Sequence, residues 1–286
     1  MYLRMKPGKS FPAPLSGSSS MQEPEKNGTI RVAGETLCAR QRAARLGLEL
    51  APLMEEGGFA SGAALVVGED RLGLAADTSS EGKGGEEVHF PDWSRIDTRS
   101  PAGRRSGQPL LRAVEGRRRR KNLLIWDLTA GWGEDAWILA SLGHRVVAVE
   151  RHPLVHACLK DAWSRAAIVS SFAARRLKPL LADSWELLRN QGFAGAGLSK
   201  PDVVYLDPLF PHRRKRGREK KPMRILRRAT QGQGGDPLEL ISAALSMPGF
   251  RLVLKRPPKA EELTVNGRSP LHRVQARGYR YDLYLS

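Results

Sequence analysis

The chain has 286 residues, and 47 lysines and arginines against 30 acidic residues give it a net charge of +17. Such a length can bury a full-sized core together with a smaller appended module. The two cysteines, Cys38 and Cys158, lie far apart and lack a His/Cys ligand cluster, which argues against a disulfide framework and a zinc site, so we expect no metal.

The N-terminal third of the chain is expected to form a tail and a small module. Residues 1–34 are rich in Ser, Pro and Gly and should be disordered. They contain no apolar stretch long enough for a signal or membrane helix, so we expect a cytoplasmic protein that binds no membrane. Residues 35–100 should form an α/β module, with a helix at 37–50, strands at 64–67 and 72–74, and a loop at 82–87. A basic linker, 101–121, should lead to the larger domain, 122–286.

The larger domain begins with a strand, a glycine loop, a helix and a second strand. The apolar run 123–126 ends in Asp127, the helix is expected at 135–142, and the strand 145–149 ends in Glu150. Units of this kind bind nucleotide-like cofactors at the carboxyl ends of their strands. Gly131 and Gly133 would let the backbone approach such a ligand, because a side chain there would occupy the ligand's volume. The two oxygens of Glu150 could accept both hydroxyls of a ribose.

Two cofactors fit this unit. The glycine loop and Ala136 match the pattern G-x-G-x-x-G/A with an acidic residue downstream, as in nicotinamide dinucleotide sites. S-adenosylmethionine (SAM) is favoured because Asp127 could hold its methionine ammonium, whereas this carboxylate would repel a pyrophosphate. A third strand, at 180–181, is followed by Asp183 and Ser184, a polar tip suited to the adenine amine. We therefore expect SAM.

The fourth strand, 203–206, is followed by Asp207, Pro208, Leu209 and Phe210. The carboxylate can accept a hydrogen bond from an exocyclic amine, the proline restricts the backbone so that carbonyls point into the pocket, and the aromatic ring offers a stacking face. This tetrapeptide predicts a nucleobase amino-methyltransferase whose catalytic residues are Asp207, Pro208 and Phe210.

The remaining strands complete a recognisable sheet. Residues 251–255 read as the fifth strand, and 274–277 with 280–285 as an antiparallel hairpin around Gly278. That ending is typical of class I methyltransferases. We predict an α/β, Rossmann-like class I fold with a mostly parallel seven-stranded sheet and a C-terminal antiparallel hairpin.

Basic charge is concentrated after residue 98, where 36 basic residues face 16 acidic ones. Residues 99–121 carry nine basic residues and one acidic residue, and residues 213–228 carry ten and one. Both runs would attract phosphates, with an affinity that falls steeply with salt. A charge run can also be a plain solvated face. Because the second run starts three residues after Phe210, it should emerge beside the catalytic pocket.

Five motifs carry a family resemblance. They are DLTAGWGED at 127–135, VERHP at 149–153, VVYLDPLFPH at 203–212, KRP at 255–257 and GYRYDLY at 278–284. In combination they resemble the RsmJ family, whose members are small-subunit ribosomal RNA guanine-N2 methyltransferases. The resemblance is dense from about residue 123 to the C-terminus and thinner through residues 37–116. It implies SAM as cofactor and small-subunit ribosomal RNA, or the 30S subunit, as partner.

The resemblance also implies positions for the site. Cofactor contacts fall on residues that follow the first four strands: Glu134, Asp135, Glu150, Arg151, Asp183, Ser184 and Asp207. Glu134 also fits the first turn of a helix, where negative charge suits the dipole. We expect RNA contacts from basic residues before the cofactor domain or beside the pocket: Arg104, Arg105, His212, Arg213, Arg214, Lys215, Arg216, Lys220, Lys221, Lys255 and Arg256.

The expected activity is methylation of the N2 amine of a specific guanine in 16S ribosomal RNA. Adenine-N6 methylation of RNA or DNA stays open, since an Asp-Pro-x-Phe pocket accommodates either amine. A non-catalytic RNA-binding or ribosome-assembly protein on the same fold is the alternative from another class.

Overall fold

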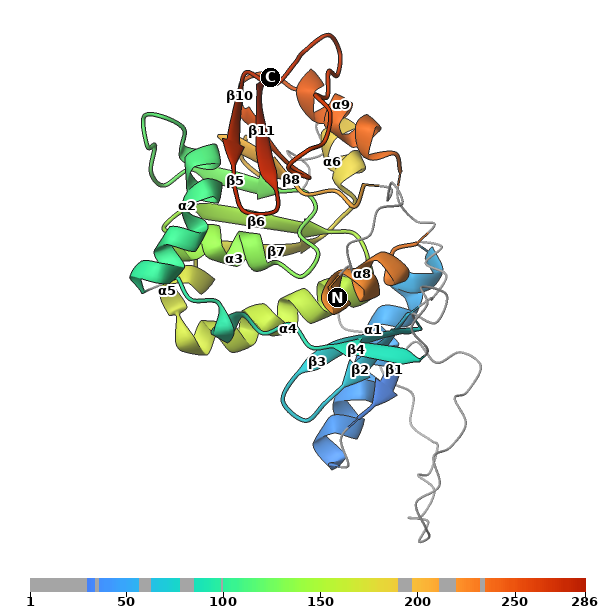
Figure 1. Ribbon diagram of the computed structural model, residues 1–286. Helices are drawn as coiled ribbons and strands as arrows, with labels where there is room; N and C mark the ends of the chain where they lie inside the picture. Colours follow the sequence, from blue (N-terminus) through green and yellow to red (C-terminus); the bar gives the residue numbers. More distant parts are fainter. Residues whose placement is uncertain are drawn as a thin grey trace, which may run out of the picture.

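The structure is a computed structural model that describes residues 30–33, 36–56, 63–77, 85–98, 100–189, 197–210, 220–231 and 235–286; side chains are described for these except at 54–56, 102 and 104–108. Two sheets, one of seven strands and one of four, organise the chain (Figure 1). Most of the expected disordered tail, residues 1–29, lies outside the described residues. Among the described helices, none is long and apolar enough to cross a membrane.

The large sheet has the order β10-β11-β9-β8-β5-β6-β7. Its parallel strands are β5 (Leu124–Asp127), β6 (Arg145–Glu150), β7 (Leu177–Leu181), β8 (Val203–Leu206) and β9 (Arg251–Arg256). The hairpin of β10 (His272–Gln275) and β11 (Arg280–Leu285) joins β9 in antiparallel orientation, with Gly278 at φ +89° in its turn. The predicted class I architecture is confirmed.

Helices cover both faces of this sheet, which explains why its strands are apolar on both sides. Ile125 packs with α2 (Pro101–Glu115), α3 (Glu134–Ser141), α4 (Pro153–Val169) and α5 (Ser171–Ala174). Its neighbour Trp126 faces the other way, toward α6 (Ser184–Arg189) and α9 (Pro237–Ser246). Because successive side chains point to opposite faces of a strand, one four-residue strand serves both cores.

Helix α2 occupies the place where we expected a basic linker. Ser100 caps its start by accepting a hydrogen bond from the Gly103 N–H, and Pro101 stands in its first turn. Leu110, Ala113 and Val114 of α2 are buried against the large sheet. The helix is therefore part of the large domain's packing, which its run of arginines obscured in the sequence.

The smaller sheet has the order β1-β2-β3-β4 and carries helix α1 (Leu37–Glu56). Strand β1 (Ile30–Val32) pairs in parallel with β2 (Ala63–Val67), and β3 (Leu72–Asp77) and β4 (Glu86–His89) follow in antiparallel order. Two expectations were wrong: the tail contributes a strand, and residues 86–87 belong to a strand and not to a loop. Strand β1 gains its partner from a distant segment and β4 pairs with the strand before it, neither of which local composition reveals.

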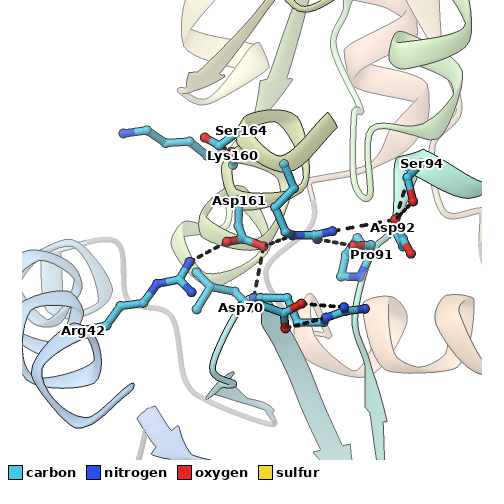
Figure 2. Close-up of polar contacts among 11 residues, drawn as sticks. Arg42, Asp70, Pro91, Asp92, Ser94, Lys160, Asp161 and Ser164 are labelled. Carbon is cyan, nitrogen blue, oxygen red and sulfur yellow. Dashed lines mark hydrogen bonds and ion pairs between the residues drawn. The ribbon is translucent and has the colours of Figure 1, made fainter. Parts of the chain in front are cut away.

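A buried carboxylate joins the two sheets. Asp161 of α4 accepts hydrogen bonds from Arg42 of α1 (2.5 Å), the Leu72 N–H of β3 (3.0 Å) and Arg165 Nε (2.9 Å), as Figure 2 shows. Arg165 also donates to the Pro91 carbonyl (2.5 Å). The side chain of Asp161 is only 5% exposed. One acid on the large domain thus fixes a helix, a strand and a connecting segment of the module.

Helix α8 (Lys221–Ala229) packs on the other side of this junction. Ile225 and Leu226 join Leu74 of β3 and Trp132 of the glycine loop in one buried cluster. Arg224 pairs with Glu87 of β4. The module therefore holds α8 in place beside the glycine loop.

Asp161→Ala should lower the free energy of unfolding by about 3 kcal/mol, because it leaves two arginines and a backbone N–H without their shared acceptor. Asp70→Ala is the control, since Asp70 is exposed and pairs with Arg71 next to it in the same junction. Urea unfolding followed by tryptophan fluorescence would measure both variants. Equal free energies of unfolding in the two variants would show that Asp161 does not stabilise the junction.

Candidate active site

A cavity of about 890 Å³ opens at the carboxyl ends of the parallel strands, between the glycine loop and helices α8 and α9. It gathers every residue for which we expected a cofactor contact: Asp127, Gly131, Gly133, Glu134, Asp135, Glu150, Arg151, Asp183, Ser184 and Asp207. Pro208 lines it too. These residues lie far apart in the sequence and meet because parallel strands end at one edge of the sheet.

Asp127 ends β5 at the floor of the cavity and is 1% exposed. Burial raises the pKa of its carboxyl well above the ordinary value, the Thr129 N–H (3.2 Å) opposes this, and the carboxylates of Asp135 and Asp207 raise it further. A buried carboxylate is costly unless a cation or several donors meet it. This corner of the cavity is therefore suited to a positively charged ligand group.

Glu150 ends β6 and pins the glycine loop. Its Oε2 accepts from the Gly131 N–H (3.0 Å) and its Oε1 from the His152 N–H (2.8 Å). Burial raises its pKa, and these amide donors lower it. Each carboxylate oxygen can accept a second hydrogen bond, so a ligand's hydroxyls can still be held here.

The structure shows why the loop needs glycine at positions 131 and 133, which the sequence did not reveal. Gly131 and Gly133 have φ of +51° and +76°, a backbone conformation that favours glycine. A Cβ on Gly133 would lie 2.4 Å from Cζ2 of Trp93, and one on Gly131 would lie 3.0 Å from Cδ2 of Leu226. The expected reason, room for a ligand, is thus corrected for Gly133. Its missing side chain makes room for Trp93, whose Nε1 donates to the Trp132 carbonyl (2.9 Å).

The polar side chains that follow the third strand, β7, already form hydrogen bonds within the protein. Ser184 donates its hydroxyl to the Leu128 carbonyl (2.6 Å), and Asp183 accepts from the Trp185 N–H (2.7 Å). Arg151 lies 3.9 Å from the second oxygen of Asp183. The indole of Trp185 also lines the cavity, and the sequence interpretation missed this flat apolar surface beside the polar tip.

Lys255 of β9 bridges two carboxylates of the cavity. Its Nζ lies 2.8 Å from Oδ2 of Asp135 and 2.9 Å from Oδ2 of Asp207. The Tyr205 hydroxyl donates to the same Asp135 oxygen at 2.5 Å. We expected Lys255 to contact RNA, but its side chain is 21% exposed and serves this cluster. The sequence does not show that strand order places Lys255 of β9 beside Asp207, at the end of β8.

Each member of the cluster responds to burial and to its neighbours. Burial alone would raise the pKa of Asp135, but Lys255 outweighs it and the pKa is lowered. Burial would lower the pKa of Lys255, but Asp135 and Asp207 raise it overall. The pKa of Asp207 stays raised, because burial exceeds the effect of Lys255. Removing the lysine would raise it further.

Three residues of the expected catalytic tetrapeptide, 207–209, line the cavity, and the fourth, Phe210, lies on its flank. Asp207 donates its N–H to Oγ1 of Thr129 (2.7 Å), and its side chain is 37% exposed. The Pro208 carbonyl accepts from the Phe210 N–H (2.9 Å). Phe210 packs against the core with Arg256 5.5 Å above its ring, and is not among the cavity's lining residues. A stacking role for Phe210 stays a prediction.

The expected RNA contacts are only partly described. His212, Arg213, Arg214, Lys215 and Arg216 lie outside the described residues, as do the side chains of Arg104 and Arg105 in α2. Lys220 and Lys221 are exposed at the start of α8, whose next turns line the cavity. Arg256 differs from expectation: its side chain is 12% exposed, and it donates to the Glu261 carbonyl (2.9 Å).

Comparisons with known proteins agree with this geometry. A family model described as "Putative SAM-dependent methyltransferase" matches residues 52–286. Ribosomal RNA small subunit methyltransferase J of Pseudomonas fluorescens is 38% identical over 88% of this chain and 91% of its own length. The protein of that name from Thioalkalivibrio sulfidiphilus is 36% identical over 90% and 97%. The crystal structure of a SAM-dependent methyltransferase from Neisseria gonorrhoeae, 24% identical, covers 90% of this chain and 95% of its own, with a TM-score of 0.58.

Glu150→Ala should weaken SAM binding by about 1.5 to 3 kcal/mol, the range for hydrogen bonds to a charged group. Glu239→Ala, which removes an exposed acid on α9, is the control and should bind SAM like the wild type. Titration calorimetry measures both. Undiminished affinity in Glu150→Ala, or tight NADH binding by the wild type without SAM binding, would contradict the assignment of this strand end.

Proposed function

This chain belongs to the SAM-dependent methyltransferase family of ribosomal RNA small subunit methyltransferase J, and from that membership we propose that it methylates the exocyclic N2 amine of a guanine in 16S ribosomal RNA. The observation that carries the chemistry is the Asp207 carboxylate, held by Lys255 at the floor of the cavity. The substrate is the ribosomal RNA itself or the small subunit that contains it.

SAM fits the charges of this cavity. Three basic residues line it, Arg151, Arg227 and Lys255, against seven acidic ones, so a ligand with cationic groups is favoured. The acids are Asp127, Glu134, Asp135, Glu150, Asp183, Asp207 and Asp236. Asp127 suits the methionine ammonium, Glu150 the ribose hydroxyls, and the surface of Trp185 the adenine. When bound, SAM supplies a methyl group that a positively charged sulfur has already activated.

The protein's remaining task is to align the target amine. A guanine amine is a weak nucleophile, because its lone pair is delocalised into the ring. Asp207 can accept a hydrogen bond from one amine N–H and so direct the lone pair toward the methyl group. Proximity and orientation of this kind can supply up to roughly 7 to 11 kcal/mol of the barrier. The methylated amine would carry one surplus proton, which water or Asp207 can accept.

Lys255 keeps Asp207 in the form that this role requires. A protonated carboxyl has a donor hydrogen on one oxygen, whereas a carboxylate offers only acceptors to the amine. The ion pair at 2.9 Å favours the carboxylate against burial and against neighbouring Asp127 and Asp135. Thr129, which accepts the Asp207 N–H, fixes the backbone from the glycine loop.

The target base must leave its stack to reach Asp207. Basic residues of α8 stand beside the opening, with Arg227 in the cavity wall and Lys220 and Lys221 exposed at the helix start. They are placed to attract the phosphates that flank such a base.

Incubation of the protein and SAM with 16S ribosomal RNA from cells that lack the gene tests this proposal. Nucleoside mass spectrometry should find N2-methylguanosine. Methylation at adenine N6 instead would favour the adenine alternative. RNA binding without any methyl transfer would favour a non-catalytic RNA-binding protein.

Asp207→Asn should lower single-turnover methyl transfer by roughly 100-fold or more at saturating SAM and RNA, the range for a group that acts on the reacting atoms. RNA affinity should change little, because the lost interaction acts on the amine and not on the phosphates. Phe210→Ala should instead impair base insertion and leave SAM affinity intact. Near wild-type turnover of Asp207→Asn would make the tetrapeptide a structural strand end.

A further inference from the structure

The edge of the large sheet opposite the cavity is strongly basic. Exposed lysines and arginines stand where the parallel strands begin, and we call them the basic rim: Arg117, Arg118, Arg119, Arg145, Arg175, Lys178 and Lys200. They come from four separate segments of the chain. In Figure 1 the turn after α2, which carries the first three, projects on the side away from α8.

Strand register places these segments side by side. Leu124 of β5 is the partner of Arg145, the first residue of β6. Lys178 pairs with Val147 of the same strand, and the Val146 N–H donates to the Arg176 carbonyl. Lys200 precedes β8, which lies beside β5. At about 4.8 Å between neighbouring strands, the rim from β8 to β7 spans roughly 14 Å.

The rim's charge is not balanced within the described part of the chain. Two acids stand at this edge, and both are engaged: Asp202 pairs with Arg120 (2.7 Å), and buried Glu115 with Lys121 (2.5 Å). No member of the basic rim forms an ion pair with a described residue. Arg119 also has φ +48°, an uncommon conformation for a residue other than glycine. Strain of this kind persists where the surrounding structure holds it and often marks a functional surface.

The two edges of the sheet therefore carry opposite charge. The carboxyl edge gathers Asp127, Asp135, Glu150 and Asp207 around a cavity suited to a cationic ligand. Phosphates are repelled by such a cluster, so contacts to a polyanion beyond those at α8 must be made elsewhere on the protein. The amino edge provides exposed basic side chains from four segments for them.

We propose that the basic rim is a second RNA-binding surface, which holds the phosphate backbone of a segment distant from the methylated base. This inference rests on the proposed function and adds a second place on the protein where that RNA is held. Strands of four to six residues separate the rim from the cavity by roughly 13 to 20 Å. A short oligonucleotide bound in the cavity does not reach across the sheet, whereas a large folded RNA can contact both edges.

A triple variant, Arg117→Ala with Arg118→Ala and Arg119→Ala, tests the rim and leaves the ion pairs of Arg120 and Lys121 intact. The control, Arg40→Ala with Arg45→Ala and Lys160→Ala, removes the same charge from exposed positions on α1 and α4. Affinities for full-length 16S ribosomal RNA, for a short hairpin from it and for SAM are measured across a salt series, together with kcat on the full-length RNA.

The rim variant should bind full-length RNA at least tenfold more weakly, with a slope of log K against log salt that is shallower by about 2 to 3, as expected for three lost phosphate contacts. Its affinities for the hairpin and SAM, and its kcat at saturating RNA, should match the wild type. The control variant should match the wild type throughout.

Three results would overturn the inference: a rim variant that binds full-length RNA like the control, an equal loss on the hairpin, or rim-dependent binding of phosphatidylserine vesicles with RNA affinity unchanged. The proposed function fails separately, if the wild type methylates no guanine in either RNA. Guanine methylation by the wild type with an unaffected rim variant would overturn this inference alone.

Discussion

The ion pair between Lys255 and Asp207 is the interaction on which the active site depends. The carboxylates of Asp127, Asp135, Glu150 and Asp207 meet at one edge of the sheet. Without a cation among them they would repel one another and take up protons. Lys255 supplies that cation from β9, and Tyr205 of β8 steadies the second carboxylate, Asp135. The order of the strands thus determines this ion pair, because it places β9 beside β8 and brings Lys255 to Asp207.

The small N-terminal module contributes to the same site through packing. Trp93, which follows β4, fills the space above Gly133 and donates to the Trp132 carbonyl, so a residue outside the large sheet helps to shape the glycine loop. Asp161 holds this segment through Arg165, which also donates to the Pro91 carbonyl. Helix α8 is clamped between the module and the loop, with Leu226 facing Gly131. The module therefore supports the cavity wall. If the module shifted, the glycine loop and α8 would shift with it and cofactor binding would weaken.

The sequence predicted best what depends on local pattern. Apolar runs that end in Asp127, Glu150 and Asp207 located three strand tips, and the parallel order required by the fold placed them at one edge. The partner of Lys255 and the neighbour of Gly133 could not be found in this way, because both depend on contacts between segments that are distant in the chain. Helix α2 was hidden by its arginines, although Ser100 and Pro101 signalled its start. For Phe210 the motif predicts a stacking role, and the structure adds a contact that the motif does not show: Arg256 lies over its ring on the flank of the cavity.

The protonation state of Asp207 tests the central claim most directly. Carbon-13 NMR of protein labelled at the aspartate carboxyls would follow it, with the Asp207 signal assigned from its loss in Asp207→Asn. Lys255 lowers the pKa of Asp207 against burial, so its replacement by methionine should move the titration of this carboxyl to higher pH. Lys255→Arg should keep the titration near that of the wild type. The same Asp207 titration in the wild type and in Lys255→Met would contradict the account.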